Sequence, residues 1–325
     1  MRRRTFVSTL IAVASVRPLA AAPQSAMLVV GLLDSGSAAE FGPAAAAFRE
    51  GLREAGFIEG LNIAIETRWA EGRYDQLPLL ATELVRLPVA VLAATGITAA
   101  LASQRATAMV PVVFHTGGDP VQAGLVASLS RPGRNVTGVV SLGKILLPKQ
   151  LELLHELVPN AHSIGFLANP KNGVLKSDTD SVREAALAKT VEAQLVLAGN
   201  DGEIDAAVAQ LGERQIGALL VQPDPFLDGR LDRIAALATR HSVPAMAAYP
   251  QFARSGGLIS YGNSPTAAYR LEAAYIARIL KGEKPADMPV QQSVKVEMII
   301  NLKTAKALGL TVPQALLARA DEVIE

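Results

Sequence analysis

Short, nearly continuous apolar runs alternate along this chain with longer segments in which apolar residues recur every three or four positions. The short runs are typical of strands buried on both faces, and the longer periodicity is typical of amphipathic helices. Their alternation predicts an α/β fold built on parallel sheets. In the first half we expect strands at residues 27–33, 61–66, 89–94, 111–115 and 135–140, and helices from Pro43, over 74–87, after Gly96 and from Asp119-Pro120.

The second half repeats the plan of the first. Val30-Gly31-Leu32-Leu33 is echoed by Ile164-Gly165-Phe166-Leu167, and Val110-Pro111 by Val243-Pro244, at offsets of 134 and 133 residues. Two like units of roughly 130 residues fit this spacing, and chance similarity among Val- and Ala-rich strands is the alternative. We therefore expect two doubly wound parallel-sheet lobes around a hinge, with residues 27–140 in the first lobe, 145–260 in the second, and a crossover helix and tail at 261–325 that pack back on the lobes or the hinge.

Composition narrows the class of protein further. Half of the 325 residues are hydrophobic, but only 4% are aromatic, and there is no cysteine. The cores must therefore be built from Ala, Val, Leu and Ile, which suits helices packed on sheets. Without cysteine, this sequence has no disulfide, no thiolate metal site, no cysteine nucleophile and no cysteine that could carry a lipid.

The first residues have the features of an export signal. Arg2, Arg3 and Arg4 precede a mostly apolar run from Phe6 to Val16, and Ala20-Ala21-Ala22 offers a small-residue cleavage site. Arg3-Arg4 with the apolar residues after it also resembles a twin-arginine signal. A basic tail on a cytosolic protein is the alternative. No other stretch has 18 uninterrupted apolar residues, so we expect a periplasmic chain that does not span the membrane.

Removal of residues 1–22 would change the charge balance. It deletes four arginines and no acid, so the formal net charge falls from +1 to −3. A mildly acidic chain without a Lys/Arg stripe is a poor candidate for nucleic-acid binding.

Polar and aromatic residues gather where the expected strands end. In parallel α/β sheets, ligands bind beyond the carboxyl ends of the strands, where helix N-termini present free N–H groups. Each such residue could instead be only a turn former or a helix cap, but the ends from both halves would face one shared crevice. The predicted ligand-binding residues are Ser35, Thr95, Gly96, Asp119, Asn169, Asp224, Phe226, Tyr249 and Tyr261.

These residue types indicate a small carboxylate-bearing ligand such as an amino acid, with aromatic amino acids among the candidates. Thr95-Gly96 opens a helix, whose dipole favours an anion. Asp119 and Asp224 end strands in opposite halves, where either could pair with an ammonium group. The rings of Phe226, Tyr249 and Tyr261 could stack on the ligand, although capping and packing would explain the same residues.

No constellation indicates catalysis or a cofactor. The four histidines have no metal-ligand spacing, and there is no G-x-S-x-G, G-x-G-x-x-G or Walker motif. His115 and Asp119 could form a dyad, but no nucleophile accompanies them. We therefore expect a binding protein with no metal, no cofactor and no enzymatic activity.

The chain also resembles a known family, the ABC-transporter substrate-binding proteins that include tryptophan-binding-protein-like members. The resemblance covers nearly the whole chain and rests on Ala47–Gly56, Trp69–Asp75, Gly118–Val121, Arg131–Gly138, Leu151–Leu154 and, most diagnostically, Ile300–Leu310. It implies a type I periplasmic-binding fold, a ligand held between the lobes by hinge closure, and a permease with its ATPase as partner. The chain departs from the lipoprotein members of this family because it lacks the lipid-bearing cysteine, so we expect it to be free in the periplasm. We also expect a monomer.

Three other functions are alternatives for a chain of this pattern. A ligand-sensing transcription regulator can share this fold, but residues 1–26 are too short for a DNA-binding helix-turn-helix and have the pattern of a signal. A periplasmic subunit that hands its ligand to a receptor is compatible with the sequence. An enzyme is disfavoured because no catalytic constellation is present.

Overall fold

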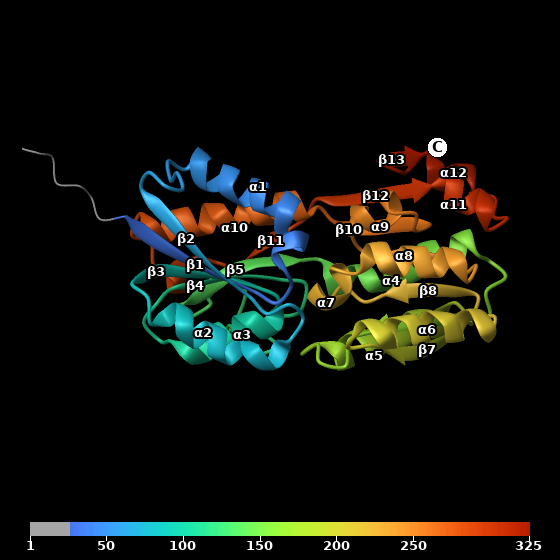
Figure 1. The fold of residues 1–325 in the computed structure, drawn as a ribbon, viewed down its shortest axis with the longest axis horizontal. Coiled ribbons are helices and arrows are strands. Elements are labelled where there is room, and N and C mark those ends of the chain that lie inside the picture. The colour runs from blue at the N-terminus through green and yellow to red at the C-terminus, as the bar shows by residue number, and fades with distance from the viewer. Residues whose placement is uncertain (1–26) are drawn as a thin grey trace, which may run out of the picture.

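The computed structural model describes residues 27–325, apart from the side chains of residues 39–41, 43, 143 and 144. The export signal expected in residues 1–22 lies outside the described residues and stays a prediction. The described chain forms two α/β lobes side by side, each with its own sheet (Figure 1). None of the described helices is long and apolar enough to cross a membrane.

The first lobe is built on a six-stranded parallel sheet in the order β11-β5-β4-β3-β1-β2. Apolar side chains from both faces of the sheet are buried under helices, as the continuous apolar runs in the sequence require. One face is covered by α1 (Ala38–Glu54) and α10 (Pro265–Leu280), and the other by α2 (Leu77–Val85) and α3 (Ile97–Ala106). Its strands are β1 (Leu28–Asp34), β2 (Ile63–Trp69), β3 (Val89–Thr95), β4 (Val112–Thr116), β5 (Val136–Ser141) and β11 (Gln291–Ser293).

The second lobe is built on a seven-stranded sheet in the order β13-β12-β10-β9-β8-β6-β7, in which only the β10–β12 pair is antiparallel. Its strands are β6 (Ser163–Ala168), β7 (Glu192–Leu197), β8 (Ala218–Val221), β9 (Ala245–Ala247), β10 (Ile259–Asn263), β12 (Val296–Asn301) and β13 (Glu322–Ile324). Helices α4 (Gly143–Leu157), α5 (Leu175–Ala188), α11 (Leu302–Ala307) and α12 (Gln314–Leu317) cover one face, and α6 (Asp201–Glu213), α8 (Leu231–Arg240) and the short α9 (Pro250–Arg254) cover the other.

The two sheets have the same strand order, which confirms the predicted fold class. Strands β2, β1, β3, β4 and β5 of the first sheet correspond in order to β7, β6, β8, β9 and β10 of the second. The paired motifs also match in place: Gly31 lies in β1 and Gly165 in β6. Each glycine lets a leucine side chain pack close to the strand, Leu92 against Gly31 and Leu211 against Gly165.

The chain passes between the lobes three times. After β5 it enters the second lobe at α4, and after β10 it returns to the first lobe at α10, which packs on α1. Strand β11 then joins the first sheet, and β12 and β13 join the second. The C-terminal stretch therefore contributes to both lobes in turn.

Three expected elements differ from the structure. Helix α1 begins at Ala38 rather than at Pro43, so Pro43 lies within the helix and not in its first turn. The second strand lies at Ile63–Trp69, where each residue pairs in register with a residue of β1, and Leu61 before it is 70% exposed. No helix starts at Asp119.

Asp119 instead forms a side-chain turn, in which its Oδ1 accepts hydrogen bonds from the N–H groups of Val121 and Gln122. The following segment stays irregular because Gly124 adopts a φ of 74°. It nevertheless buries Leu125 and Val126 in the first-lobe core. Burial of these apolar side chains therefore does not require a helix here.

Candidate ligand-binding cleft

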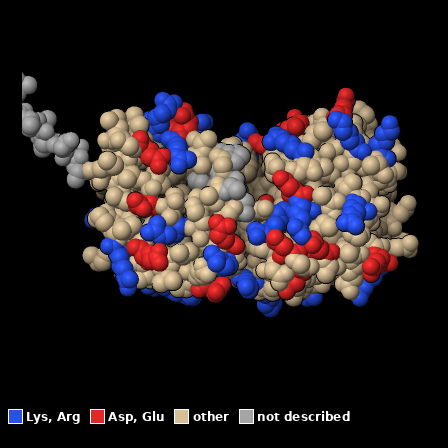
Figure 2. All heavy atoms as spheres, in the orientation of Figure 1, with Lys and Arg blue, Asp and Glu red and all other residues tan. Residues whose placement is uncertain are grey.

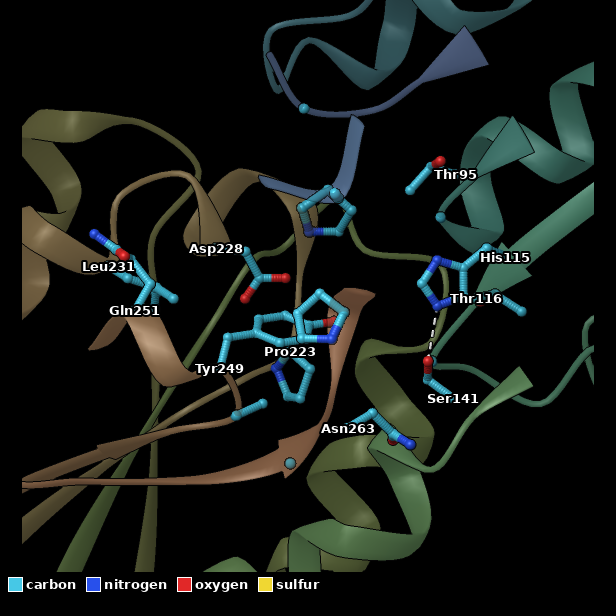
Figure 3. A pocket seen from close by; sticks show the side chains of 18 of the residues that line it. Thr95, His115, Thr116, Ser141, Pro223, Asp228, Leu231, Tyr249, Gln251 and Asn263 are labelled. Carbon is cyan, nitrogen blue, oxygen red and sulfur yellow. Dashed lines mark hydrogen bonds between the residues drawn. The ribbon is translucent and has the colours of Figure 1, made fainter. Parts of the chain in front are cut away.

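A cleft of about 760 Å³ lies between the lobes, at the carboxyl ends of the parallel strands. The first lobe contributes the ends of β1, β3, β4 and β5, and the second contributes the segments that follow β8, β9 and β10. The two walls face each other across this space (Figure 3). Strand ends from both halves therefore do meet at one crevice, as the sequence pattern predicts.

The first-lobe wall is polar and centred on His115. His115 Nε2 lies 2.7 Å from Ser141 Oγ, and the imidazole meets the ring of Tyr269 edge-on at 4.9 Å between centroids. His115 follows Phe114 in β4 and pairs in register with Thr95 of β3, which places both side chains at the same edge of the sheet. Burial lowers the pKa of His115 to about 4, so the imidazole is neutral at physiological pH.

Helix α3 begins at this wall. Gly96 precedes it with a φ of 90°, and no side chain caps its first turn. Gly96 and Ile97 both line the cleft. An uncapped helix start presents free N–H groups and the positive end of the helix dipole, which together favour a carboxylate.

The second-lobe wall combines an acid with a phenol. The carboxylate of Asp228, which closes the short helix α7 (Pro225–Asp228), points across the cleft toward the side of Thr95 and His115 (Figure 3). Tyr249 lies beside it. Burial and, secondarily, the negative charge of Asp228 raise the pKa of Tyr249, so its hydroxyl stays protonated. This wall can therefore offer one negative charge and one aromatic face.

Three buried side-chain atoms at the cleft have no hydrogen-bond partner within the described protein: Thr95 Oγ1, His115 Nδ1 and Gln150 Oε1. The amide nitrogen of Gln150 is used, because it donates to the carbonyl of Tyr261 at 2.6 Å. A buried polar atom without a partner is costly, at roughly 1–3 kcal/mol each. Three such atoms on one cavity indicate a polar ligand that supplies the missing partners.

Of the nine residues predicted from the sequence, Thr95, Gly96 and Tyr249 line the cleft. Tyr261 lies against the second-lobe core, and Asp119 forms the turn described above. The other four, Ser35, Asn169, Asp224 and Phe226, are buried where the lobes touch beside the cleft.

Asp224 shows why these residues are withdrawn from the cleft. It is fully buried, and its carboxylate accepts hydrogen bonds from Asn169, Asn172 and the hydroxyl of Tyr74. It also caps α7 by accepting from the N–H groups of the two residues after Pro225. Burial raises the pKa of Asp224 while these hydrogen bonds oppose the rise. Its oxygens are directed to protein donors, so the structure does not bring it to a ligand.

Sequence reasoning missed several lining residues: Thr116, Ser141, Gln150, Asp228, Asn263 and Tyr269. Thr116 and Ser141 are the last residues of β4 and β5, so the strand-end rule would have found them with exact strand bounds. Asp228 stands one helical turn after Asp224, and no sequence signal distinguishes the capping acid from the cleft acid. Tyr269 and Gln150 lie inside helices, where only the packing shows which way they face.

Charged side chains are mixed elsewhere on the surface. On the face shown in Figure 2, Lys and Arg are interspersed with Asp and Glu. Several of them pair, as Arg233 does with Asp205 at 2.6 Å and Arg230 with Asp201 at 2.8 Å. Exposed pairs of this kind contribute about 0–1 kcal/mol each, so they do not organise the site.

Two like lobes with a polar cleft between them define a protein that encloses a small ligand. Residues 42–324 match the family model described as "ABC transporter substrate binding protein", and the chain belongs to this family. Members of this family are the substrate-binding components of ABC transporters and act outside the cytoplasm. The fold is of the type I periplasmic-binding kind.

Among curated proteins, the chain is similar to a tyrosine-binding protein of Clostridioides difficile, with 27% identity over 81% of this chain and 75% of that protein. Among solved structures it is similar to a conserved domain protein from Vibrio cholerae, with a TM-score of 0.86, 26% identity, and coverage of 91% of this chain and 99% of that one. An ABC domain from Streptococcus pneumonia in complex with L-Trp gives a TM-score of 0.84 at 25% identity, over 92% of this chain and 100% of that one.

A ligand-free, open substrate-binding protein from Clostridium difficile has the same 25% identity and 92% coverage of this chain (99% of that chain) but a TM-score of 0.65. In overall structure the described chain is therefore more similar to the L-Trp complex than to this open, ligand-free protein.

Proposed function

We propose that this chain captures an aromatic L-amino acid in the cleft between its lobes and delivers it, chemically unchanged, to a membrane permease and its ATPase. The observation that carries this proposal is the set of three unpartnered buried polar atoms, on Thr95, His115 and Gln150, that line one cavity. The proposal also takes the chain to be periplasmic and monomeric, with the export signal in residues 1–22 removed.

Each part of an aromatic amino acid has a matching group on the cleft. The uncapped start of α3 at Gly96 suits the carboxylate, and Thr95 Oγ1 lies next to it. Asp228 suits the ammonium group, in place of Asp119 and Asp224, which lie away from the cleft. Tyr249 and Tyr269 supply ring faces, worth about 0.5–1.5 kcal/mol beyond buried area for an aromatic pair.

The charge on the cleft favours a ligand that carries a cationic group. Among the side chains that the structure describes, its lining includes Asp34, Asp178, Asp228, Asp232 and Glu297 and one basic side chain, Arg254. His115 adds no charge because it is neutral. A ligand with only a negative charge would be repelled by these acidic side chains, whereas a zwitterion can place its ammonium group against them. The L-Trp complex and the tyrosine-binding protein among the similar proteins support the same class of ligand.

A thermal-shift screen followed by calorimetry tests the proposal. The probes are L-tryptophan, L-tyrosine, tryptamine, which lacks the carboxylate, and indole-3-propionate, which lacks the ammonium group. We expect L-tryptophan or L-tyrosine to raise the melting temperature by mass action, and both truncated analogues to bind at least tenfold more weakly. Tight binding of an uncharged sugar, with no binding of any amino acid, would overturn the proposal.

A further inference from the structure

Beside the ligand cleft, the lobes meet in a second, fully buried contact. From the first lobe comes Tyr74, in the 3₁₀ helix η1 (Tyr74–Gln76) that follows β2. From the second lobe comes Asp224, at the start of α7. Tyr74 OH donates to Asp224 Oδ2 at 2.9 Å and accepts from the N–H of Phe226 at 3.1 Å. Tyr74 does not line the cleft.

The surrounding surfaces fit closely. Gly72 adopts a φ of 75°, and a Cβ there would lie 2.6 Å from the Phe226 ring. Gly96 approaches Pro225 in the same way, with a Cβ position 3.2 Å from its ring. These glycines let the backbone of the first lobe lie directly on side chains of the second. Tyr74 is 6% exposed and Asp224 is 0% exposed, so water is excluded from the hydrogen bond between them.

The two partners differ in what they lose when the lobes separate. Asp224 keeps Asn169, Asn172 and two N–H groups of α7 as donors, all from its own lobe. Separation therefore does not leave a bare carboxylate in the core. Tyr74 gives up both of its partners and returns its hydroxyl to water. The contact is thus able to open and close without disturbing either lobe.

We propose that Tyr74 and Asp224 form a latch that stabilises the closed arrangement without touching the ligand, and so set how tightly the ligand is held. When a ligand binds the closed state, part of its binding free energy is used to close those molecules that are still open. A protein that is already mostly closed therefore binds the ligand more tightly. Loss of the latch hydrogen bond should lower the closed-to-open ratio about tenfold. Tyr74 is a positioning residue in this scheme.

The test measures the lobe arrangement in the absence of ligand. The chain has no cysteine, so Met109→Cys and Leu187→Cys, at positions 88% and 80% exposed and one in each lobe, allow specific labelling for single-molecule energy transfer. In this background we compare Tyr74→Phe with wild type. We expect a clear rise in the open population for Tyr74→Phe.

Two control variants accompany this comparison, one that should leave the lobe arrangement unchanged and one that should open it. Tyr275→Phe removes a hydroxyl that donates to the carbonyl of Pro289 within the first lobe, so it should leave the distribution unchanged. Gly118→Ala adds a methyl group 2.8 Å from the Val174 side chain across the lobes, at a position without a positive φ, so it should favour the open form. If Gly118→Ala shifts the distribution and Tyr74→Phe does not, the latch is refuted.

The test still gives an answer if Tyr74→Phe does not fold, and its result does not depend on which ligand the protein binds. Should Tyr74→Phe fail to give a cooperative melt, Tyr74→Leu replaces it, since it also removes the hydroxyl that donates to Asp224 and accepts from the N–H of Phe226; an unchanged distribution there counts equally against the latch. The ligand-free measurement does not depend on the proposed ligand. Failure of L-tryptophan and L-tyrosine to bind would therefore overturn the proposed function and leave the latch standing.

Discussion

The side-chain amide of Asn263 donates a hydrogen bond to the carbonyl oxygen of Ser293 at 2.6 Å, while its oxygen accepts from the N–H of Leu142 at 2.5 Å. These three residues lie on the three separate passages of the chain between the lobes. Asn263 is buried and also lines the cleft. One side chain therefore joins all parts of the hinge and faces the space where a ligand would lie.

Asn263→Ala should impair both stability and hinge geometry. It leaves the N–H of Leu142 and the carbonyl of Ser293 without their partner, at a cost of about 2–4 kcal/mol in the free energy of unfolding. Asn135→Ala is the matched control, because the Asn135 side chain also makes two hydrogen bonds to backbone groups, here by donating to two carbonyls, but within the first lobe. Urea unfolding should show losses for both. Only Asn263→Ala should also change the lobe distribution, and an equal distribution in both variants would contradict a hinge role.

Asp228→Asn should weaken the binding of aromatic amino acids. Removing the charge that faces the cleft leaves the ligand ammonium group without its counterion, which is worth about 1.5–3 kcal/mol, or roughly 10- to 100-fold in Kd. Isothermal titration with L-tryptophan measures the loss. Asp205→Asn, which breaks an exposed pair with Arg233 away from the cleft, should bind as wild type does. Equal affinity in both variants would assign the ammonium group to another acid.

The neutral state of His115 predicts a specific dependence of stability on pH. Its pKa is near 4 in the folded protein against 6.5 for an ordinary histidine, so below pH 6.5 the unfolded chain binds a proton that the folded chain does not. Stability should therefore fall as the pH drops from about 6.5 to about 4, by about 3 kcal/mol at 1.36 kcal/mol per pKa unit.

His115→Gln isolates this contribution. We expect the difference in unfolding free energy between wild type and His115→Gln to change by about 3 kcal/mol between pH 7 and pH 4. His162→Gln, at an exposed position, is the control and should give a flat difference. A flat difference for His115→Gln as well would mean that His115 takes up its proton without hindrance in the folded state.

Much of the fold follows from the sequence because its signals are local. Buried strands such as β1 and β4 are marked by continuous apolar runs, and the repeated order of elements gives the two like lobes. Strand β7 lacked such a signal, since as an edge strand it alternates exposed and half-buried residues, and no strand was expected there. Helix α10 could be expected as a helix, but its place on α1 depends on packing between distant segments.

The position of the site was predicted in part, because strand ends are also local features of the sequence. The strand-end rule located the crevice and brought Thr95 and Tyr249 to it. It could not separate Asp224, which meets Tyr74 150 residues away, from Asp228, which faces the cleft. Both acids lie on one short helix, and their different surroundings are set by the opposite lobe. Sequence patterns encode strand ends, whereas the division between latch and cleft is a property of the assembled lobes.

Glu272 supplies the last prediction. It lies on α10, is 1% exposed, and its Oε1 has no partner among the described residues. Burial raises the pKa of Glu272 well above its usual range, and the negative charge of Asp34 raises it further. The folded protein therefore keeps a proton on Glu272 that the unfolded chain releases above about pH 4.5. Wild-type stability should fall as the pH rises above this value, until it reaches the folded-state pKa.

Glu272→Gln removes this penalty because the amide is neutral at every pH. We expect its unfolding free energy relative to wild type to increase steadily from pH 4.5 to pH 8, measured by urea unfolding at intervals of one pH unit. Glu184→Gln, exposed on α5, is the control and should show no such trend. A difference for Glu272→Gln that does not vary with pH would show that Glu272 is ionised in the folded protein, and a buried cation or donor would then have to face it.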